Sequence, residues 1–241
     1  TMDHPLTASA DPIRFHRAEI LKTLKPPQLR DIARSTYRAQ YRGYRAIRGV
    51  QPNSTTETYF RARAELSSPR WRGVPIVMES GKRMREQRKE IVVTFRHPLP
   101  CLCPAGQEHH KNRVIFSLEP TEGIRIQFWS KKPGLDFVME ERTLDFMLRQ
   151  ERKSQYVEEY EKLLLDCIAG DQTLFISTEE VDEMWRFTDP IARAWQKNVA
   201  PLEFYDPDTN QAADAADARQ QASAPAGAMK KEIAIVGLGK M

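Results

Sequence analysis

Five short runs rich in β-branched and aromatic residues constrain the fold of this chain more than any other feature. They cover residues 58–65, 90–95, 113–118, 124–129 and 143–148. No long helical pattern separates them, whereas a parallel pair of strands needs a crossover of about a dozen residues or more, usually a helix. Gly123 lies between the third and fourth runs, as is typical of a hairpin turn. The pattern therefore predicts a large, mainly antiparallel sheet.

Two helices are expected after the sheet. Apolar residues recur at helical spacing over residues 155–168, and Gly170 is a natural end for that helix. Ser177 followed by Glu180 three positions later has the pattern of a capping box that begins a second helix. Pro190 is expected to end or kink this second helix. Together these patterns predict an α+β fold, a large mainly antiparallel sheet with helices packed on one face.

The composition is that of a globular protein rather than a membrane or disordered one. The chain has 241 residues, of which 40% are hydrophobic and 29% charged. It contains no apolar run of about 18 residues, so no membrane span is expected. Three cysteines do not form a disulfide framework, which indicates a reducing, cytoplasmic location.

A change in composition near the end of the chain suggests three regions. Residues 1–205 form the predicted domain. Residues 206–228 contain no aromatic or large aliphatic side chain, so a disordered linker is expected there. Residues 229–241 run from an apolar strand into Gly237 and Gly239, as a dinucleotide-binding unit begins, and we interpret them as the truncated start of such a domain with two cofactor-binding glycines.

Basic residues are concentrated in the first part of the chain. Residues 1–100 carry 20 Lys and Arg against 9 Asp and Glu, a net charge of +11, and the whole chain carries +4. A basic region attracts phosphate groups on nucleic acids or on small metabolites. Five arginines spaced for one helical face would suit nucleic acid, but an ordinary basic surface or subunit contact is favoured; they are Arg30, Arg34, Arg38, Arg42 and Arg45.

The most distinctive stretch for ligand binding covers residues 73–84. An apolar strand ends at Ser80 and Gly81, and Lys82 follows immediately, with further basic residues after it. Glycine lets the backbone approach a ligand closely, and a lysine amine offers a compact charge to a phosphate. The alternative is a solvated basic loop after a strand.

Metal binding and nucleophilic catalysis are not favoured by the sequence. Sulfur and imidazole groups lie close together at Cys101, Cys103, His109 and His110. The spacing differs from that of structural zinc sites, so a metal-free hairpin loop is expected. No nucleophile motif of the Gly-x-Ser-x-Gly kind is present.

Several of these segments, taken in order, resemble glucose-6-phosphate dehydrogenase. Residues 71–84 are similar to the family's Trp-x-Gly-Val-Pro … Gly-Lys-x-Leu segment, and further similarities follow at residues 54–60, 112–120, 131–134 and 163–185. The resemblance covers about residues 14–205 and only the family's C-terminal domain. It implies an α+β domain whose sheet forms a homodimer interface, in an enzyme that oxidises glucose 6-phosphate to 6-phosphogluconolactone with NADP.

The resemblance also assigns roles to individual residues. Lys82 matches the lysine that holds the sugar phosphate, Gln87 stands where a second basic residue is usual, and Arg88 beside it can replace that residue. Glu119 takes a substrate-contacting position that is usually glutamine. The base and the coenzyme domain belong to the family's N-terminal part, so no catalytic residue is expected here. A second, structural NADP site is not expected, because its basic residues are replaced by Glu79, Val92 and Ser117.

Two further readings accompany this resemblance. The last residues, from Met229, are similar to the start of 6-phosphogluconate dehydrogenase. The alternative function is a non-catalytic dimerisation module, or a regulatory module that binds a sugar phosphate. Neither nucleic acid nor a membrane is expected as a partner.

Overall fold

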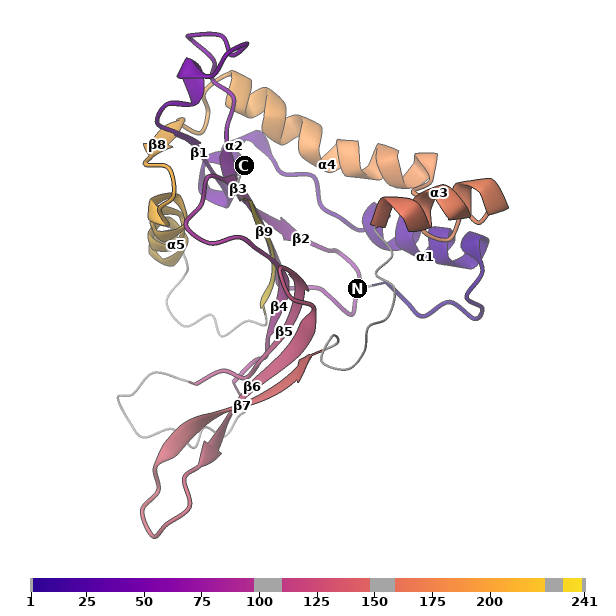
Figure 1. The fold of residues 1–241 in the computed structure, drawn as a ribbon, viewed down its shortest axis with the longest axis vertical. Coiled ribbons are helices and arrows are strands. Elements are labelled where there is room, and N and C mark those ends of the chain that lie inside the picture. Colours follow the sequence, from indigo (N-terminus) through magenta and orange to yellow (C-terminus); the bar gives the residue numbers. More distant parts are fainter. Residues whose placement is uncertain (1, 98–109, 148–158, 224–231, 240–241) are drawn as a thin grey trace.

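A computed structural model of the chain describes residues 2–97, 110–147, 159–223 and 232–239. The strands are β1 (Thr36–Tyr41), β2 (Tyr59–Glu65), β3 (Pro75–Lys82), β4 (Arg88–Thr94), β5 (Arg113–Glu119), β6 (Gly123–Lys131), β7 (Met139–Met147), β8 (Glu203–Tyr205) and β9 (Glu232–Gly239). They form one sheet in the order β7-β6-β5-β4-β9-β3-β2-β1-β8 (Figure 1). Only β1–β8 and β3–β9 are parallel pairs among these strands, which confirms the mainly antiparallel prediction.

Five helices accompany the sheet in the described ranges: α1 (Ala10–Lys22), α2 (Leu29–Ser35), α3 (Glu159–Ala169), α4 (Thr178–Gln196) and α5 (Gln211–Ser223). Gly170 follows α3 with a positive φ of 71°, as expected for a glycine that ends a helix. The capping box that begins α4 is confirmed: the Glu180 N–H donates to the Ser177 hydroxyl over 3.2 Å, and the Ser177 N–H donates to the Glu180 carboxylate over 2.8 Å. None of these helices is long and apolar enough to cross a bilayer.

Pro190 was expected to end or kink the second helix. The helix does not end there, because α4 continues through Pro190 to Gln196. A proline inside a helix removes one hydrogen bond and costs about 3 kcal/mol. The turns beyond it bury Ile191, Ala194 and Trp195. We attribute the continuation to this burial, which offsets the cost of the proline.

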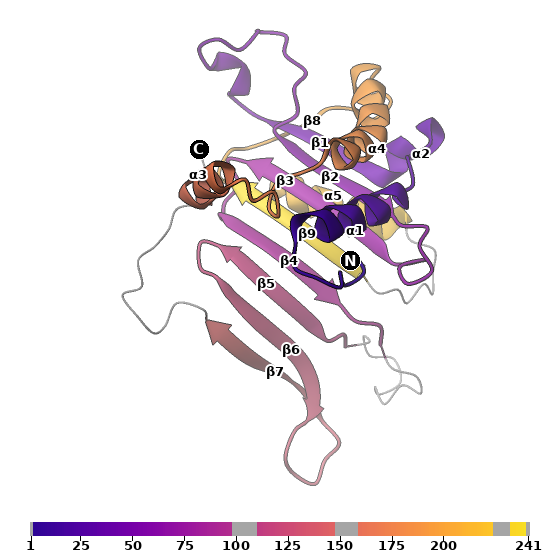
Figure 2. The same ribbon diagram turned by 90° about the vertical axis from the view of Figure 1, so that its right-hand side faces the viewer.

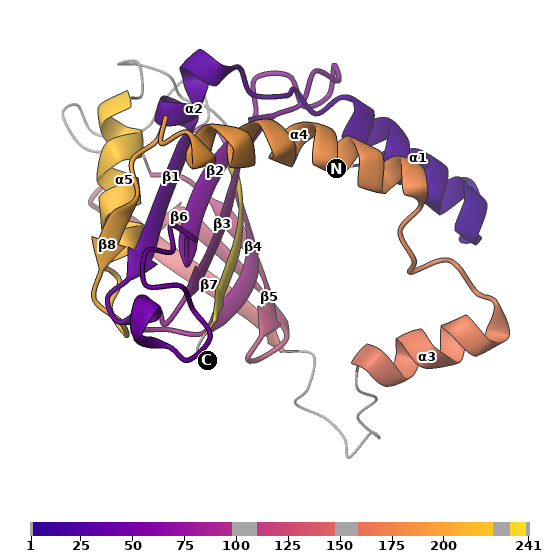
Figure 3. The ribbon, with the colours of Figure 1, turned by 90° about the horizontal axis from the view of Figure 1, so that it is seen from above.

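Helices lie on both faces of the sheet, which corrects the prediction of one covered face. Side chains of a strand alternate between faces. In β2, Ala62 and Ala64 pack with α4, whereas Tyr59 belongs to a second cluster with Ala212 and Ala216 of α5. Figure 2 shows α1 and α4 in front of the sheet and α5 behind it, and Figure 3 gives the same arrangement from above.

Helix α5 occupies most of the region expected to be a disordered linker. Its Ala212 and Ala216, one turn apart, are buried against the tyrosines of the sheet. Alanine has the highest helix propensity, and its small side chain lets the helix approach those rings closely. The absence of large apolar residues therefore does not indicate disorder here, because the sheet supplies the aromatic side of the contact.

The last described segment also differs from expectation. Residues 232–239 do not form a separate unit but form β9, inside the sheet between β3 and β4. Strands pair through backbone hydrogen bonds, which depend little on the side chains present. A segment that favours the extended conformation can therefore occupy an unpaired strand position in a sheet.

The arginines expected to share one helical face are divided between elements. Arg30 and Arg34 lie in α2, and Arg38 lies in β1. The Arg38 side chain is buried and its Nε donates to the Ala200 carbonyl over 2.9 Å. The chain thus has no continuous helical stripe at these positions, and the nucleic-acid alternative loses the geometry on which it depended.

Candidate functional site

Lys82 is the last residue of β3, and its backbone is fixed on both sides. Its N–H donates to the Thr58 carbonyl over 2.8 Å, and its carbonyl accepts from the Tyr205 hydroxyl over 2.6 Å. The residue itself is exposed. A lysine held by its backbone while its side chain faces solvent is suited to meeting a charged ligand, because the origin of the flexible chain is fixed.

The Tyr205 hydroxyl that fixes Lys82 is itself buried among aromatic rings. Tyr41 and Tyr59 both lie 6.2 Å from its ring, centroid to centroid. Burial raises the pKa of Tyr205 to about 12, against an opposing effect of its hydrogen bond with Thr58. The hydroxyl therefore remains protonated and able to donate to the Lys82 carbonyl throughout the neutral range. Sequence reasoning missed this residue, because nothing local marks a partner more than a hundred positions away.

The basic residues that follow Lys82 do not form one cluster of unpaired cations. Arg83 has a positive φ of 52° and forms an ion pair with Asp208. Gln87 is exposed just before β4 begins. Arg88 lies 3.5 Å from Glu90, but its buried Nε has no hydrogen-bond partner among the described residues. Because this nitrogen is buried, an anion can meet Arg88 only through the outer part of its side chain, which is 43% exposed overall.

Glu119 is the last residue of β5 and forms an ion pair with Lys89 of β4. The peptide bond between Glu119 and Pro120 is cis. The pairing matters for ligand binding because a lone carboxylate would repel a phosphate. With Lys89 beside it, Glu119 carries a compensated charge.

The strand register brings the predicted residues to the same end of the sheet. Lys82 lies opposite Gly239, Arg88 opposite Leu238, and Lys89 opposite both Gly237 and Glu119. With strands about 4.8 Å apart, β9 separates Lys82 from Arg88 by about 10 Å. The candidate site is therefore the end of the sheet where β3 and β5 finish and β4 begins. In this register Lys82, Lys89 and Glu119 share one face of the sheet, and Arg88 lies on the other.

Gly237 and Gly239, which we interpret as cofactor-binding glycines, lie at the end of β9. Both pair in regular register with β3. A dinucleotide-binding turn needs the glycines between a strand and a helix N-terminus, where backbone N–H groups reach the pyrophosphate. The role of Gly237 and Gly239 as cofactor-binding glycines stays a prediction.

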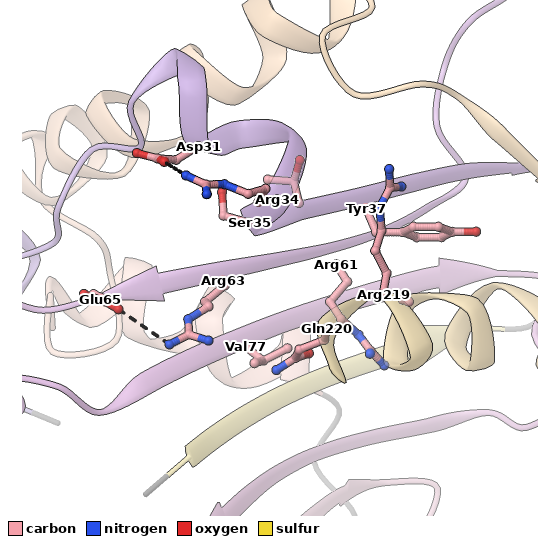
Figure 4. Close-up of a pocket in the computed structure, with 12 residues that line it drawn as sticks. Asp31, Arg34, Ser35, Tyr37, Arg61, Arg63, Glu65, Val77, Arg219 and Gln220 are labelled. Atoms are coloured by element: carbon pink, nitrogen blue, oxygen red, sulfur yellow. Dashed lines mark hydrogen bonds and ion pairs between the residues drawn. The ribbon is translucent and has the colours of Figure 1, made fainter. Parts of the chain in front are cut away.

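A cavity of about 340 Å³ opens on the α5 face of the sheet, apart from these residues (Figure 4). Its arginines face carboxylates: Arg61 binds Glu79 and Asp217, and Arg34 binds Asp31. Because these charges are already neutralised, the cavity is less suited to a phosphate than the end of β3. In the sequence, the charged residues at alternate positions of β2 are the pattern that could have indicated this cavity. The lining consists of Asp31, Arg34, Ser35, Thr36, Tyr37, Arg61, Arg63, Glu65, Val77, Ala216, Arg219 and Gln220.

The segment expected to be a metal-free hairpin loop falls largely outside the described residues, which exclude Cys101, Cys103 and His109. His110 is described, and its ring stacks on Trp129 with the centroids 3.6 Å apart. Within the described ranges, no three His, Cys, Asp or Glu residues are grouped as metal ligands would be.

A family model and two sequence relatives point to the same enzyme family. The model of the family described as glucose-6-phosphate dehydrogenase, C-terminal domain, matches residues 1–224. Glucose-6-phosphate 1-dehydrogenase of Gluconobacter oxydans (strain 621H) is 34% identical over 215 residues, which is 85% of this chain and 43% of the relative. The enzyme of the same name from Aggregatibacter actinomycetemcomitans is 35% identical over 203 residues, 79% of this chain and 40% of the relative. The chain thus spans less than half the length of these curated relatives.

Solved structures agree with the sequence relatives. A crystal structure of glucose-6-phosphate 1-dehydrogenase from Mycobacterium avium superposes with a TM-score of 0.70 at 27% identity, covering 86% of this chain and 42% of that one. A glucose-6-phosphate dehydrogenase in complex with its substrate glucose-6-phosphate gives 0.73 at 26% identity, covering 86% and 43%. The fold, the ordered motifs and the family match together show that this chain belongs to the family of glucose-6-phosphate dehydrogenase C-terminal domains.

Proposed function

We propose that this chain is the substrate-binding and dimerisation domain of an NADP-dependent glucose-6-phosphate dehydrogenase. The observation that carries the proposal is Lys82, an exposed lysine fixed by its backbone at the end of β3 in a domain of this family. A solved relative that binds glucose 6-phosphate supports the same ligand.

The residues around Lys82 suit a dianionic phosphate. The Lys82 amine supplies a positive charge to the phosphate. Arg88 pairs with Leu238 and so lies on the sheet face opposite Lys82, and a contribution from it requires its partly exposed guanidinium to reach the phosphate around the strand ends. Gln87 adds an amide beside Arg88 in place of the usual second basic residue. The Lys89–Glu119 pair leaves the Glu119 carboxylate free to accept from sugar hydroxyls without strongly repelling the phosphate.

In the proposed reaction this domain binds and orients the sugar. The oxidation removes a hydride from C1, which NADP accepts, and a proton from the C1 hydroxyl, which gives the lactone carbonyl. That proton needs a base within hydrogen-bond reach. We assign the base and the coenzyme site to polypeptide outside this chain, so the chain alone is expected not to turn over. Its own contribution is to fix the phosphate, which limits the positions open to C1.

Calorimetric titration with glucose 6-phosphate tests the assignment of Lys82. Wild-type chain should bind the sugar phosphate, and Lys82→Ala should weaken binding by about tenfold or more, because a charge-assisted contact with phosphate is lost. Lys22→Ala, which removes an exposed lysine of α1 instead, serves as a control of equal charge change and should bind as wild type does.

The same titration distinguishes the proposed function from the alternative of a non-catalytic module. Binding that is equal in wild type and Lys82→Ala would contradict the role of Lys82. No binding to either would favour a non-catalytic dimerisation module over a substrate-binding domain.

The homodimer is proposed on an exposed apolar surface of β5, β6 and β7. Residues opposite one another in a sheet share a face, and the register joins Phe116 to Ile124 and Ile124 to Phe146. The neighbouring row joins Ile126 to Leu144, and the side chains of Phe146 and Leu144 are about 60% exposed. A contiguous exposed apolar patch of this kind indicates a protein interface, and we propose a second copy of the chain as the partner.

Sedimentation velocity tests this interface. The wild-type chain should sediment as a dimer, and the double variant Leu144→Glu/Phe146→Glu should sediment as a monomer, because two charges would be buried at the contact. Thr143→Glu places a charge on the opposite face of β7 and should leave the dimer intact. A monomeric wild type, or a dimer that survives both charges, would contradict the proposal.

A cytoplasmic location is proposed because the three cysteines do not form a disulfide framework, which indicates a reducing environment. Cys167 is an exposed free thiol. Free thiols of this kind persist where glutathione and thioredoxin keep proteins reduced.

A further inference from the structure

At the centre of the sheet, β9 is the one described strand that fills the gap between β3 and β4. Strands β3 and β4 are adjacent in the sequence and joined by just the short stretch 83–87, yet they do not pair with each other. Each of them pairs with β9 instead, β3 in parallel and β4 antiparallel. Figure 2 shows β9 between them. The gap is one strand wide, so β3 and β4 stand about 10 Å apart and cannot exchange backbone hydrogen bonds.

The pairing along the gap is nearly complete. On the β3 side it runs from Ile76 opposite Ile233 to Lys82 opposite Gly239, and on the β4 side it runs from Arg88 opposite Leu238 to Thr94 opposite Glu232. Without a strand in this position, the backbone N–H and C=O groups of β3 and β4 that face the gap would lose their hydrogen-bond partners. Within the described residues β9 is also the only strand that joins the β1–β3 part of the sheet to the β4–β7 part.

The strand in the gap lies outside the residues that match the family model. The family match ends at residue 224, and β9 begins at Glu232. Its sequence, Glu-Ile-Ala-Ile-Val-Gly-Leu-Gly, is apolar, rich in β-branched residues and free of proline. These are the properties of a segment that adds to an exposed strand edge through its backbone.

From these observations we propose that the gap between β3 and β4 is a strand-accepting site. It takes an extended apolar segment that runs parallel to β3, and its occupant is the chain's own segment 232–239, held by backbone pairing as an exchangeable donor strand. The proposal does not depend on the proposed sugar phosphate site.

Hydrogen exchange of the full chain tests whether β9 is needed. The double variant Ile235→Pro/Val236→Pro removes two successive N–H donors, which point to opposite sides of the strand and thus to both neighbours. Amides of β3 and β4 should then exchange about tenfold faster or more, whereas those of β1 and β2 should stay protected. The control Ile235→Val/Val236→Ile keeps both donors and the β-branched character and should exchange as wild type does.

Addition of a strand in trans tests whether the site accepts one. A synthetic peptide of residues 229–241 should restore protection of β3 and β4 in the proline variant, and the same peptide carrying both prolines should not. Unchanged protection of β3 and β4 in the proline variant would overturn the proposal. It would mean that β3 and β4 pair with each other directly, or that their amides are protected without a strand between them. Failure of the wild-type peptide to restore protection would overturn it as well.

A second measurement covers the case in which the proline variant does not fold. A protease recognition sequence inserted after Gly227 allows the wild-type tail to be cut from the rest of the chain. The cleaved tail should co-elute with residues 1–227 in size-exclusion chromatography, and an excess of fluorescent 229–241 peptide should replace it. Elution of the tail as a free peptide without competitor would contradict the proposal.

Discussion

Replacing Arg61 by methionine is expected to lower the free energy of unfolding by about 3–5 kcal/mol. Arg61 of β2 donates to the Glu79 carboxylate of β3 over 2.7 Å from Nη2 and 3.1 Å from Nε. Both side chains are almost completely buried. Tyr59 also donates to Glu79, over 2.9 Å, but a phenol supplies no charge. The substitution therefore leaves a carboxylate buried without its cation, which is the costly state of a broken ion pair.

A second substitution separates the cost of the unpaired charge from the loss of packing. The double variant Arg61→Met/Glu79→Leu removes both charges and should recover most of the stability, because a buried ion pair gains little over apolar residues of similar volume. Urea unfolding followed by far-UV circular dichroism gives the free energies. Arg193→Met breaks an exposed pair with Asp189 on α4 and should cost less than about 1 kcal/mol. A loss as small as this for Arg61→Met would show that Glu79 is not effectively buried.

Replacing Trp195 by alanine should destabilise the domain by about 3–5 kcal/mol, the usual cost of removing a large buried aromatic side chain. Trp195 attaches α4 to the sheet: its indole N–H donates to the Thr36 hydroxyl of β1 over 3.1 Å, and its ring lies 6.4 Å from that of Phe60 of β2. Arg38 also lies over the indole, 5.8 Å from the centroid. The substitution leaves a cavity between helix and sheet.

The same helix provides a matched control. Trp185 is 59% exposed, ten positions before Trp195 on α4, and its replacement by alanine should change the stability by about 0.5 kcal/mol at most. Urea unfolding by far-UV circular dichroism avoids the change in tryptophan fluorescence that both variants share. Equal losses for the two substitutions would mean that α4 is not anchored to the sheet at Trp195.

Features determined by nearby residues were predictable from the sequence. Ser177 and Glu180 begin α4 as expected, Gly170 ends α3, and the β-rich runs become β2 and β4–β7. Each of these signals operates within a few positions, through a side chain that caps a helix or an alternation that faces a core.

Features determined by distant partners were not predictable. Pro190 stays inside α4 while Trp195, beyond it, is buried on the sheet, and residues 211–223 are helical because tyrosines from other elements cover their alanines. At the candidate site, Lys82 and its basic neighbours were visible in the sequence. The hydroxyl of Tyr205 that fixes the Lys82 carbonyl, and the carboxylates that neutralise Arg83 and Lys89, depend on contacts that a single sequence does not show.

The parallel pairing of β1 with β8 has a consequence for how the domain is made. Ala39 lies opposite Glu203, so the first strand meets this neighbour only after nearly the whole domain has left the ribosome. Until then one long edge of β1 is open, and an open edge of this kind is prone to pair with other nascent chains. Synthesis in the cell therefore exposes this domain to aggregation for longer than its finished structure would suggest, and chaperones that shield strand edges should raise its yield.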